Sequence, residues 1–348
     1  MRQISAIYNI FNHHTKHSGY FQFVRYIYDI THHITPIKIL PMTFVNLLPN
    51  PFVTCSGMRW YEKRMFFDEL VLMIDWFFHS NKIYHFLYGE MAYRYLGNLK
   101  RYIPHNNKII CTFHQPSKIF EEIVKDIRHI QFIDAIIVLS KEQLAYFKNI
   151  INPDKVFFIP HGIDTEYFRP KENKPKNNVF SCLTIGHWLR DFEMLSKVIK
   201  ILNTTNMNFI FNIVSSNEGN KYFEDIPNVN LRLQITDKEL LFLYQDADIL
   251  VLPLIDSTAN NTLLEGLACG LPIVTTDVGG VKDYVNDSCA VLIPKGNAEM
   301  MAEEVIKLVN DKVRLHQMAQ NSRKRALELS WDKIAEQIES VYQKVAKG

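Results

Sequence analysis

The stretch Asp248–Val285, DILVLPLIDSTANNTLLEGLACGLPIVTTDVGGVKDYV, contains the features that decide the fold of this chain. It begins with an apolar run that ends at Pro253, and a polar loop follows that run. We expect a helix to open near Thr262 and to be stopped by Gly270 and Pro272. A second apolar run then ends in a turn that holds two glycines. This order of strand, helix and strand predicts a unit of a parallel sheet.

The same alternation extends over both halves of the chain, which indicates an α/β fold. In the first half we expect strands at Ile4–Ile10, Ile37–Leu40, Ile83–Leu87, Lys108–Thr112, Ala135–Leu139 and Val156–Ile159, and helices at Tyr20–Thr31, Tyr61–His79, Ile119–Arg128 and Lys141–Asn149. In the second half we expect strands at Val179–Ile185, Phe209–Val214, Val229–Leu233, Ile249–Leu252, Ile273–Thr275 and Ala290–Ile293, and helices at Phe192–Asn203, Asp237–Gln245, Thr262–Cys269, Ala298–Asn310 and Trp331–Ala346.

A segment rich in Pro, Lys and Asn interrupts the alternation between the two halves and has the composition of a linker. The pattern therefore predicts one domain over residues 1–170 and a second over residues 171–330. The last helix, within 331–348, has an apolar stripe, so we expect it to cross back and dock on the first domain.

The composition excludes several classes of protein. The chain has 348 residues, of which 47% are apolar and 22% charged, and its formal net charge is +2. Such a chain forms a globular core rather than a disordered one, and it lacks the basic excess that nucleic-acid binding requires. Its five cysteines are scattered and predict neither a disulfide framework nor a zinc site. We find no signal peptide or membrane span and expect a cytoplasmic protein.

In open α/β sheets, ligands bind at the carboxyl ends of the strands. The helix that begins near Thr262 follows such an end, and the backbone amides of Asn261, Thr262 and Leu263 are expected to form a phosphate site there. The alternative is structural, because Thr262 and Glu265 have the spacing of a capping box.

The residues of this region also resemble a known family. LEGLACGLPIV at 264–274, followed by DVGG at 277–280, is similar to the nucleotide-binding signature of retaining glycosyltransferases of the GT-B fold, glycosyltransferase family 4. Further similar stretches follow the family's order: T-x-H at 112–114, DAIIVLS at 134–140, IPHGID at 159–164 and TDKELLFLYQDADILVLP at 236–253. The resemblance covers most of the chain from about residue 108 onward. It implies two Rossmann-like domains whose parallel sheets face each other across a cleft.

The resemblance also implies roles for residues of the second domain. Glu265 takes the place of the second Glu of an E-x7-E motif, which binds the ribose hydroxyls of a nucleotide-sugar donor. Ser257 stands where the first Glu normally contacts the donor sugar, which is a departure from the motif. After Gly186, His187 and Arg190 stand where the family carries an Arg and a Lys that neutralise phosphate charge.

Two residues of the first half complete the implied site. His114 matches a histidine that lies beside the donor sugar, and Gly19 follows the first strand where the family has a Gly-Gly turn near the diphosphate. Ser18 replaces one of those glycines. Arg190, Glu265 and His114 are thus the expected catalytic residues.

The resemblance therefore implies a hexosyltransferase that moves a sugar, with retention, from a nucleotide-diphosphate sugar to a hydroxyl of a glycan or lipid-linked acceptor. Such a reaction would serve polysaccharide, glycolipid or other glycoconjugate synthesis. Neither a cofactor nor a metal ion is expected. The Asp246–Asp248 D-x-D triplet is assigned to a helix end, and His13, His14 and His17 have no nearby acidic or Cys partner in sequence. The alternatives are a degenerate nucleotide-sugar-binding protein and a nucleotide-sugar epimerase on the same fold.

The acceptor is expected to meet the first domain. The stretches YFQFVRYIYDI and RWYEKRMFF, which begin at Tyr20 and Arg59, are assigned to ordinary amphipathic core helices. The alternative is a face that associates peripherally with the inner surface of a membrane. The sequence makes no prediction of oligomeric state.

Overall fold

The computed structural model describes residues 3–8, 16–27, 30–34, 51–103, 105–172 and 179–347, with the backbone alone for 30–34. The chain divides into two compact units. Unit 1 comprises described residues within Met1–His14, Tyr20–His161 and Asp332–Gly348, and unit 2 those within Thr15–Gly19 and Gly162–Trp331. The chain passes from unit 1 to unit 2 between His161 and Gly162, before the boundary that we expected at residue 170.

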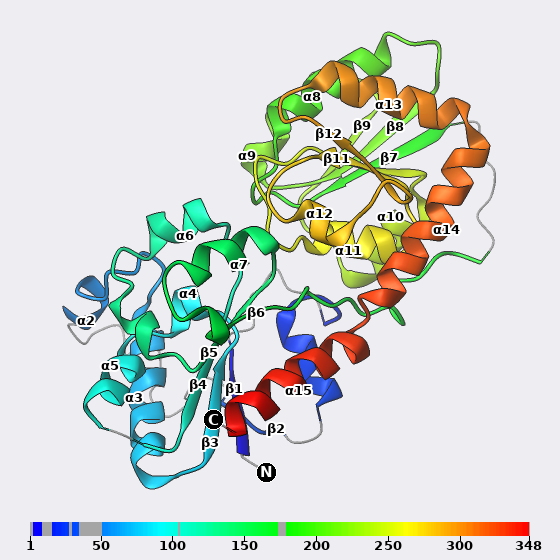
Figure 1. Cartoon of the computed structure of the whole chain (residues 1–348). Helices are drawn as coiled ribbons and strands as arrows, with labels where there is room; N and C mark the ends of the chain where they lie inside the picture. Colours follow the sequence, from blue (N-terminus) through cyan, green and yellow to red (C-terminus); the bar gives the residue numbers. More distant parts are fainter. Residues whose placement is uncertain are drawn as a thin grey trace. The chain divides into compact units, whose positions relative to one another are not determined.

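Unit 1 contains a parallel sheet with the strand order β2-β1-β3-β4-β5-β6 (Figure 1). Its strands are β1 (Gln3–Ile7), β2 (Ile30–Ile34), β3 (Lys82–Phe86), β4 (Lys108–Phe113), β5 (Ala135–Val138) and β6 (Val156–Phe158). Its α-helices are α2 (Pro51–Thr54), α3 (Lys63–Phe78), α4 (Gly89–Ala92), α5 (Tyr95–Tyr102), α6 (Ser117–Ile123), α7 (Lys141–Lys148) and α15 (Trp331–Lys347), and its 3-10 helices are η1 (Tyr20–Tyr26), η2 (Arg128–Phe132) and η3 (Pro153–Lys155).

Unit 2 contains a second parallel sheet with the order β12-β11-β10-β7-β8-β9. Its strands are β7 (Phe180–Ile185), β8 (Phe209–Val214), β9 (Val229–Arg232), β10 (Ile249–Leu252), β11 (Ile273–Thr276) and β12 (Ala290–Ile293). Its helices are α8 (Phe192–Asn203), α9 (Asn217–Asn220), α10 (Asp237–Asp246), α11 (Asn261–Ala268), α12 (Val281–Tyr284), α13 (Ala298–Asn310) and α14 (Lys312–Glu328). In Figure 1, α8 and α13 lie on one face of this sheet and α10 and α11 on the other.

Sequence signals explain where the helices of unit 2 begin. Asp191 accepts a hydrogen bond of 2.9 Å from the amide of Met194 at the start of α8. Thr236 and Glu239 form a reciprocal capping box at the start of α10. Such caps satisfy amides that have no partner within the helix. The central strands β10 and β11 are buried along their whole length, as their apolar sequences predict for a parallel sheet covered on both faces.

Two predicted helices of the first half are wrong in part. The stretch from Tyr20 is helical only as η1, and Ile30 to Ile34 form β2 where the predicted helix was to end. This segment is rich in β-branched residues, which favour a strand. The predicted helix at 119–128 ends at Ile123, because Val124 forms a bridge with Met58. The predicted strand at 37–40 lies outside the described residues.

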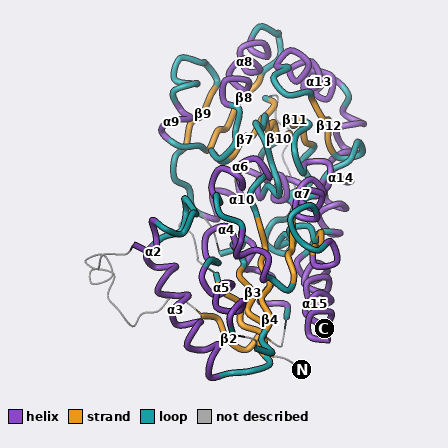
Figure 2. The backbone as a smooth tube through the Cα atoms, turned by 60° about the vertical axis from the view of Figure 1, so that its left-hand side comes forward, coloured by secondary structure: helices purple, strands orange, loops and turns teal. Residues whose placement is uncertain are grey.

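Helices cover both faces of the sheet of unit 1. Figures 1 and 2 show α3 and α5 on one side of the strands and α15 on the other. Side chains of β3 alternate accordingly: Tyr84 and Phe86 belong to the apolar core with α3 and α5, whereas His85 contacts Tyr342 of α15. The His85 imidazole is fully buried, and burial lowers its pKa to about 3, so it is neutral at physiological pH.

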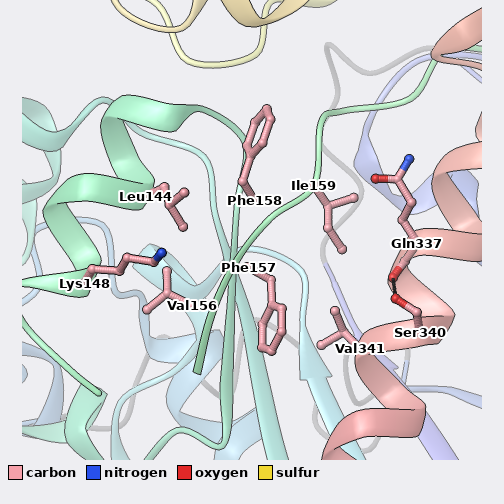
Figure 3. A pocket seen from close by; sticks show the side chains of 9 residues that line it. All are labelled: Leu144, Lys148, Val156, Phe157, Phe158, Ile159, Gln337, Ser340 and Val341. Carbon is pink, nitrogen blue, oxygen red and sulfur yellow. Dashed lines mark hydrogen bonds between the residues drawn. The ribbon is translucent and has the colours of Figure 1, made fainter. Parts of the chain in front are cut away.

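The aromatic stretches of unit 1 are buried only in part. Tyr20 and Phe23 of η1, Tyr61 before α3 and Met65 in the first turn of α3 are buried, whereas Tyr26 is exposed. The C-terminal helix also borders a shallow pocket, which Figure 3 shows between α7, β6 and α15. Among the described parts of the chain, no helix has the length and apolar character that crossing a lipid bilayer requires.

Candidate functional site

The candidate site lies in unit 2, where β7 and β10 are neighbours at the centre of the sheet. After β7 the chain forms β8 on one side of that strand, and it later forms β10 on the other side of β7. The loops after these two strands therefore diverge, and parallel sheets bind ligands at such a switch point. The loop after β7 carries Arg190, and the loop after β10 leads into α11.

The loop after β7 has an unusual backbone. Gly186 has a φ of +92°, and Leu189 has a φ of +55°, which is rare for a leucine. A Cβ on Gly186 would lie 2.8 Å from Nη2 of Arg190, so only glycine leaves room for this guanidinium. The loop is fixed by the amide of Ile255, which donates 2.9 Å to the carbonyl of Leu189. The backbone therefore turns Arg190 back toward the end of β7. His187 is exposed on this loop.

The guanidinium of Arg190 joins the two loops of the site. Nε donates to the carbonyl of Ile185 at 2.9 Å, and Nη1 donates to that of Trp188 at 3.0 Å. Nη2 donates to Oγ1 of Thr262 at 3.0 Å and to Oδ1 of Asn260 at 3.3 Å. Burial lowers the pKa of Arg190 to about 10, so the group still carries its positive charge at neutral pH. A fixed cation thus lies beside the first turn of α11.

Helix α11 is capped by Asn260 and not by Thr262. Asn260 Oδ1 accepts a bond of 3.3 Å from the amide of Leu263, whereas Oγ1 of Thr262 lies between Arg190 and the carbonyl of Ile185. The capping-box alternative for Thr262 and Glu265 is therefore wrong. In the described part of the structure, the amides of Asn261 and Thr262 have no acceptor. Two amides and a guanidinium together make an anion-binding corner.

Glu265 lies one turn further along α11 and is 4% exposed. Its Oε1 accepts a hydrogen bond of 2.5 Å from the hydroxyl of Ser18, and its Oε2 accepts one of 2.8 Å from the hydroxyl of Tyr244. Burial raises the pKa of Glu265 to about 7, although both hydroxyls and the charge of Arg190 oppose this shift. The carboxyl group is therefore poised to change charge near neutral pH.

The loop before α11 is held by the Gly-Gly turn after β11. The amide of Gly280 donates 2.8 Å to the carbonyl of Ser257, and a Cβ on Gly279 would lie only 2.0 Å from that oxygen. Gly279 also has a φ of +48°. Ser257 is buried, and its hydroxyl contacts the carbonyl of Thr258 at 3.4 Å. The two glycines thus allow close packing between two loops.

A short segment from the N-terminal part of the chain belongs to unit 2. We call Lys16–Gly19 the strap. The amide of Lys16 donates a hydrogen bond of 3.2 Å to Asp237, and Nδ1 of His17 lies 2.8 Å from Oδ2 of Asp164. The hydroxyl of Ser18 donates a hydrogen bond to Glu265. Gly19 is buried, and its φ of +103° favours glycine at this position.

His114 lies in unit 1, at the end of β4. Its Nε2 donates a hydrogen bond of 2.7 Å to the carbonyl of Leu87, and its backbone amide donates one of 3.1 Å to Oε1 of Glu90. Its ring stacks on Tyr88 with a centroid distance of 4.4 Å and meets Tyr20 edge-on at 5.0 Å. The role expected of His114 toward a donor sugar stays a prediction.

Unit 2 therefore brings together most of the residues expected from the sequence. They are Gly19, Gly186, Arg190, Asn261, Thr262, Leu263 and Glu265. Sequence reasoning missed Asn260 and Tyr244. Asn260 is a favourable cap that the nearby T-x-x-E spacing obscured, and Tyr244 stands at an apolar position of α10 that resembles ordinary core.

The described residues hold no group of three or more His, Cys, Asp or Glu side chains arranged to bind a metal ion. Asp248 accepts a bond of 2.8 Å from the amide of Ser181 at the start of β7, which fits the structural role expected for the D-x-D triplet. His13 and His14 lie outside the described residues.

Parts of the chain are similar to known proteins. Residues 179–311 match the family model of glycosyl transferases group 1. The chain is 22% identical over 203 residues to an MMP α-(1→4)-mannosyltransferase of Mycolicibacterium hassiacum, covering 56% of this chain and 49% of that protein. It is 25% identical over 216 residues to the capsular polysaccharide biosynthesis glycosyltransferase CapM of Staphylococcus aureus, covering 59% and 56%. The chain thus spans about half the length of these relatives.

Among solved structures, the chain resembles Anabaena HepE in complex with UDP and glucose, with a TM-score of 0.64 and 15% identity over 79% of this chain and 82% of that one. Each unit has the parallel α/β sheet that this fold requires. The chain therefore has the GT-B fold, and its residues 179–311 are similar to the group 1 glycosyl transferases.

Proposed function

We propose that this protein transfers a sugar from a nucleotide-diphosphate sugar to an acceptor hydroxyl, with retention of the anomeric configuration. The observation that carries the proposal is the joining of Arg190 to Asn260 and Thr262, at the first turn of α11, within the matched family segment. This corner offers one fixed positive charge and two amides, which suits a diphosphate.

Glu265 supplies the second half of the proposed donor site. A carboxylate accepts hydrogen bonds from two vicinal hydroxyls, as ribose presents them. Its place on α11, one turn beyond the amides of Asn261 and Thr262, fits a ligand whose phosphate lies at the helix start. Glu265 therefore orients the nucleoside while Arg190 binds the diphosphate.

The chemical step follows from these positions. The bond between the anomeric carbon and the diphosphate oxygen breaks, and the acceptor oxygen attacks the same face of the sugar. The departing phosphate oxygen takes the acceptor proton. Negative charge grows on the diphosphate as it leaves, so Arg190 and the α11 amides stabilise the transition state more than the ground state. These groups supply positive charge from the chain itself, and we infer a reaction that needs no metal cofactor.

His114 is proposed to position the donor sugar, and unit 1 to receive the acceptor. The relatives named above include a mannosyltransferase and a capsular polysaccharide glycosyltransferase. We infer that the acceptor of this protein is a glycan or a glycolipid.

Ser257 favours one competing function, nucleotide-sugar binding without transfer. This loop position carries a buried hydroxyl that contacts the carbonyl of Thr258, in place of an acid. A donor whose sugar is held less firmly would bind and not react. The epimerase alternative has no such observation in its favour.

Titration calorimetry with UDP-, GDP- and ADP-sugars, followed by assays of donor hydrolysis and transfer, tests the proposal. We expect one base to bind preferentially and that donor to turn over. Glu265→Gln should weaken binding about tenfold or more, whereas Glu299→Gln, an exposed position on α13, should bind as the wild type does. Binding without turnover on any acceptor would favour the binding protein, and normal binding by Glu265→Gln would refute the site. Unchanged turnover in a chelator would support the metal-free reaction.

A further inference from the structure

The strap contacts three separate parts of unit 2. The amide of Lys16 bonds to Asp237 at the start of α10. His17 Nδ1 lies 2.8 Å from Oδ2 of Asp164, and its ring stacks in parallel on Tyr167 with a centroid distance of 3.6 Å. Ser18 donates to Glu265 on α11. Three contacts over three consecutive residues fix this segment against the candidate site.

The Ser18 contact has a direct effect on Glu265. Both carboxylate oxygens already accept hydrogen bonds, Oε1 from Ser18 and Oε2 from Tyr244. With 4% of its surface exposed, Glu265 offers no room for an incoming hydroxyl. A ligand that bonds to this carboxylate must approach to about 2.7 Å and must therefore displace one of its present partners.

Tyr244 and Ser18 differ in how readily a ligand can displace them from Glu265. Tyr244 is fully buried within α10, and its hydroxyl also lies 3.4 Å from the carbonyl of Thr262. Ser18 lies in the short strap next to Gly19, and glycine adopts other backbone conformations more easily than any other residue type. The hydroxyl of Ser18 is therefore the partner that a ligand replaces.

We propose that the strap is an intramolecular competitor of the nucleotide: the Ser18 hydroxyl occupies the place of a ligand hydroxyl on Glu265, and nucleotide binding displaces the strap. The proposal rests on the donor site described under Proposed function. Only the fraction of molecules with the strap released binds nucleotide, so the apparent dissociation constant rises in inverse proportion to that fraction. The contacts of His17 and Lys16 stabilise the closed strap without touching Glu265 and thereby set the fraction that is open.

Calorimetry on the full chain at pH 8, with UDP, GDP and ADP as probes, tests the competition. Ser18→Ala removes the contact to Glu265, and His17→Ala removes an anchor distant from it. Both should bind the preferred nucleotide more tightly, Ser18→Ala by roughly tenfold and His17→Ala by several-fold. Ser340→Ala on α15 and His316→Ala on α14 are the matched controls, and both should keep the wild-type affinity.

Hydrogen exchange supplies a second readout that does not depend on variants. Ligands normally slow exchange at the residues they cover. Saturating nucleotide should instead speed exchange at Lys16–Gly19 while it slows exchange at the start of α11. Unchanged or weaker binding by both variants, or slower exchange of the strap with nucleotide, would overturn the competition and leave the donor site intact. If the wild type and both variants bind none of the nucleotides, the proposed function and the competition both fail.

Discussion

The imidazole of His85 on β3 lies 2.7 Å, through Nδ1, from the hydroxyl of Tyr342 on α15, a residue 257 positions later in the chain. The other ring nitrogen, Nε2, lies 2.8 Å from Oγ1 of Thr112 on the neighbouring strand β4. A fully buried, neutral ring thus connects two strands of unit 1 to the last helix. Buried polar groups of this kind are costly when a partner is removed.

Tyr342→Phe should therefore lower the stability of unit 1. The variant leaves Nδ1 of His85 without its hydroxyl partner, which should reduce the free energy of unfolding by about 1–3 kcal/mol. Urea unfolding measures this change in the free energy of unfolding. Hydrogen exchange at the amides of β3 and α15 then shows whether the loss of stability lies in unit 1. Tyr102→Phe, which removes a hydroxyl from a side chain 73% exposed, is the control and should alter stability little. Equal stability of both variants would contradict a structural role for the His85 contact.

Arg190→Lys should impair nucleotide-diphosphate binding even though the charge is retained. Lysine has no planar fork, so it cannot keep the bonds to Ile185, Trp188, Asn260 and Thr262 together. We expect affinity for the preferred nucleoside diphosphate to fall by about 10- to 100-fold. Arg314→Lys, at a cation 3.8 Å from Glu304 on the outside of unit 2, serves as the control in the same calorimetric titration. Wild-type affinity in the Arg190→Lys variant would mean that charge alone suffices.

Nucleotide binding should depend on the protonation of Glu265. Burial raises the pKa of this carboxyl to about 7, and only the ionised form accepts bonds from both ribose hydroxyls. Affinity should therefore rise as the pH increases from 6 to 7 and level off above about 8. The nucleoside diphosphate also ionises in this pH range. The pH profile of Glu265→Gln, which lacks the carboxyl group, measures the contribution of the diphosphate alone. Parallel pH profiles for the wild type and Glu265→Gln would exclude Glu265 as the titrating group.

Gly279→Ala should disturb the loop before α11. The added Cβ would lie 2.0 Å from the carbonyl of Ser257, at a backbone φ of +48°. We expect a loss of more than about 2 kcal/mol in the stability of unit 2, from clash and strain together. Gly296→Ala is a matched control, since its φ is +80° and an added Cβ meets no atom within 4 Å. Its cost should be about 1 kcal/mol, so thermal unfolding should separate the two variants.

The sequence predicted unit 2 well because local signals and the tertiary structure agree there. The apolar runs that became β10 and β11 are uninterrupted, and glycine and proline mark the end of α11. Unit 1 agreed less well near its beginning. The aromatic run after Tyr20 fits a helix by its spacing, yet it forms a 3-10 helix that leads into β2. The spacing of apolar residues within a segment does not show whether that segment pairs with the edge strand of a sheet.

The candidate site was predicted residue by residue, but its contacts were not. The T-x-x-E spacing left open a capping role for Thr262, whereas in the structure its hydroxyl accepts a hydrogen bond from Arg190 and Asn260 caps the helix. Asn and Thr both cap helices. Which of the two caps α11 depends on the guanidinium of Arg190, which lies on a loop 72 residues earlier in the chain. The sequence indicates for Ser18 only that it replaces a glycine of the family's turn. Its bond to Glu265 spans 247 residues, a distance over which no sequence pattern is informative.

The attachment of α15 to unit 1 has a consequence for synthesis on the ribosome. Translation delivers β3 and β4 before residues 162–331, and Tyr342 follows only after them. Until Tyr342 is made, Nδ1 of His85 lacks its hydroxyl partner, although the segments of residues 162–331 have already been synthesised. Domains of nascent chains usually complete themselves from the N-terminus onward. Unit 1 departs from this order, because its helix α15 is synthesised only after residues 162–331, and unit 1 cannot form all of its contacts before unit 2 has been made.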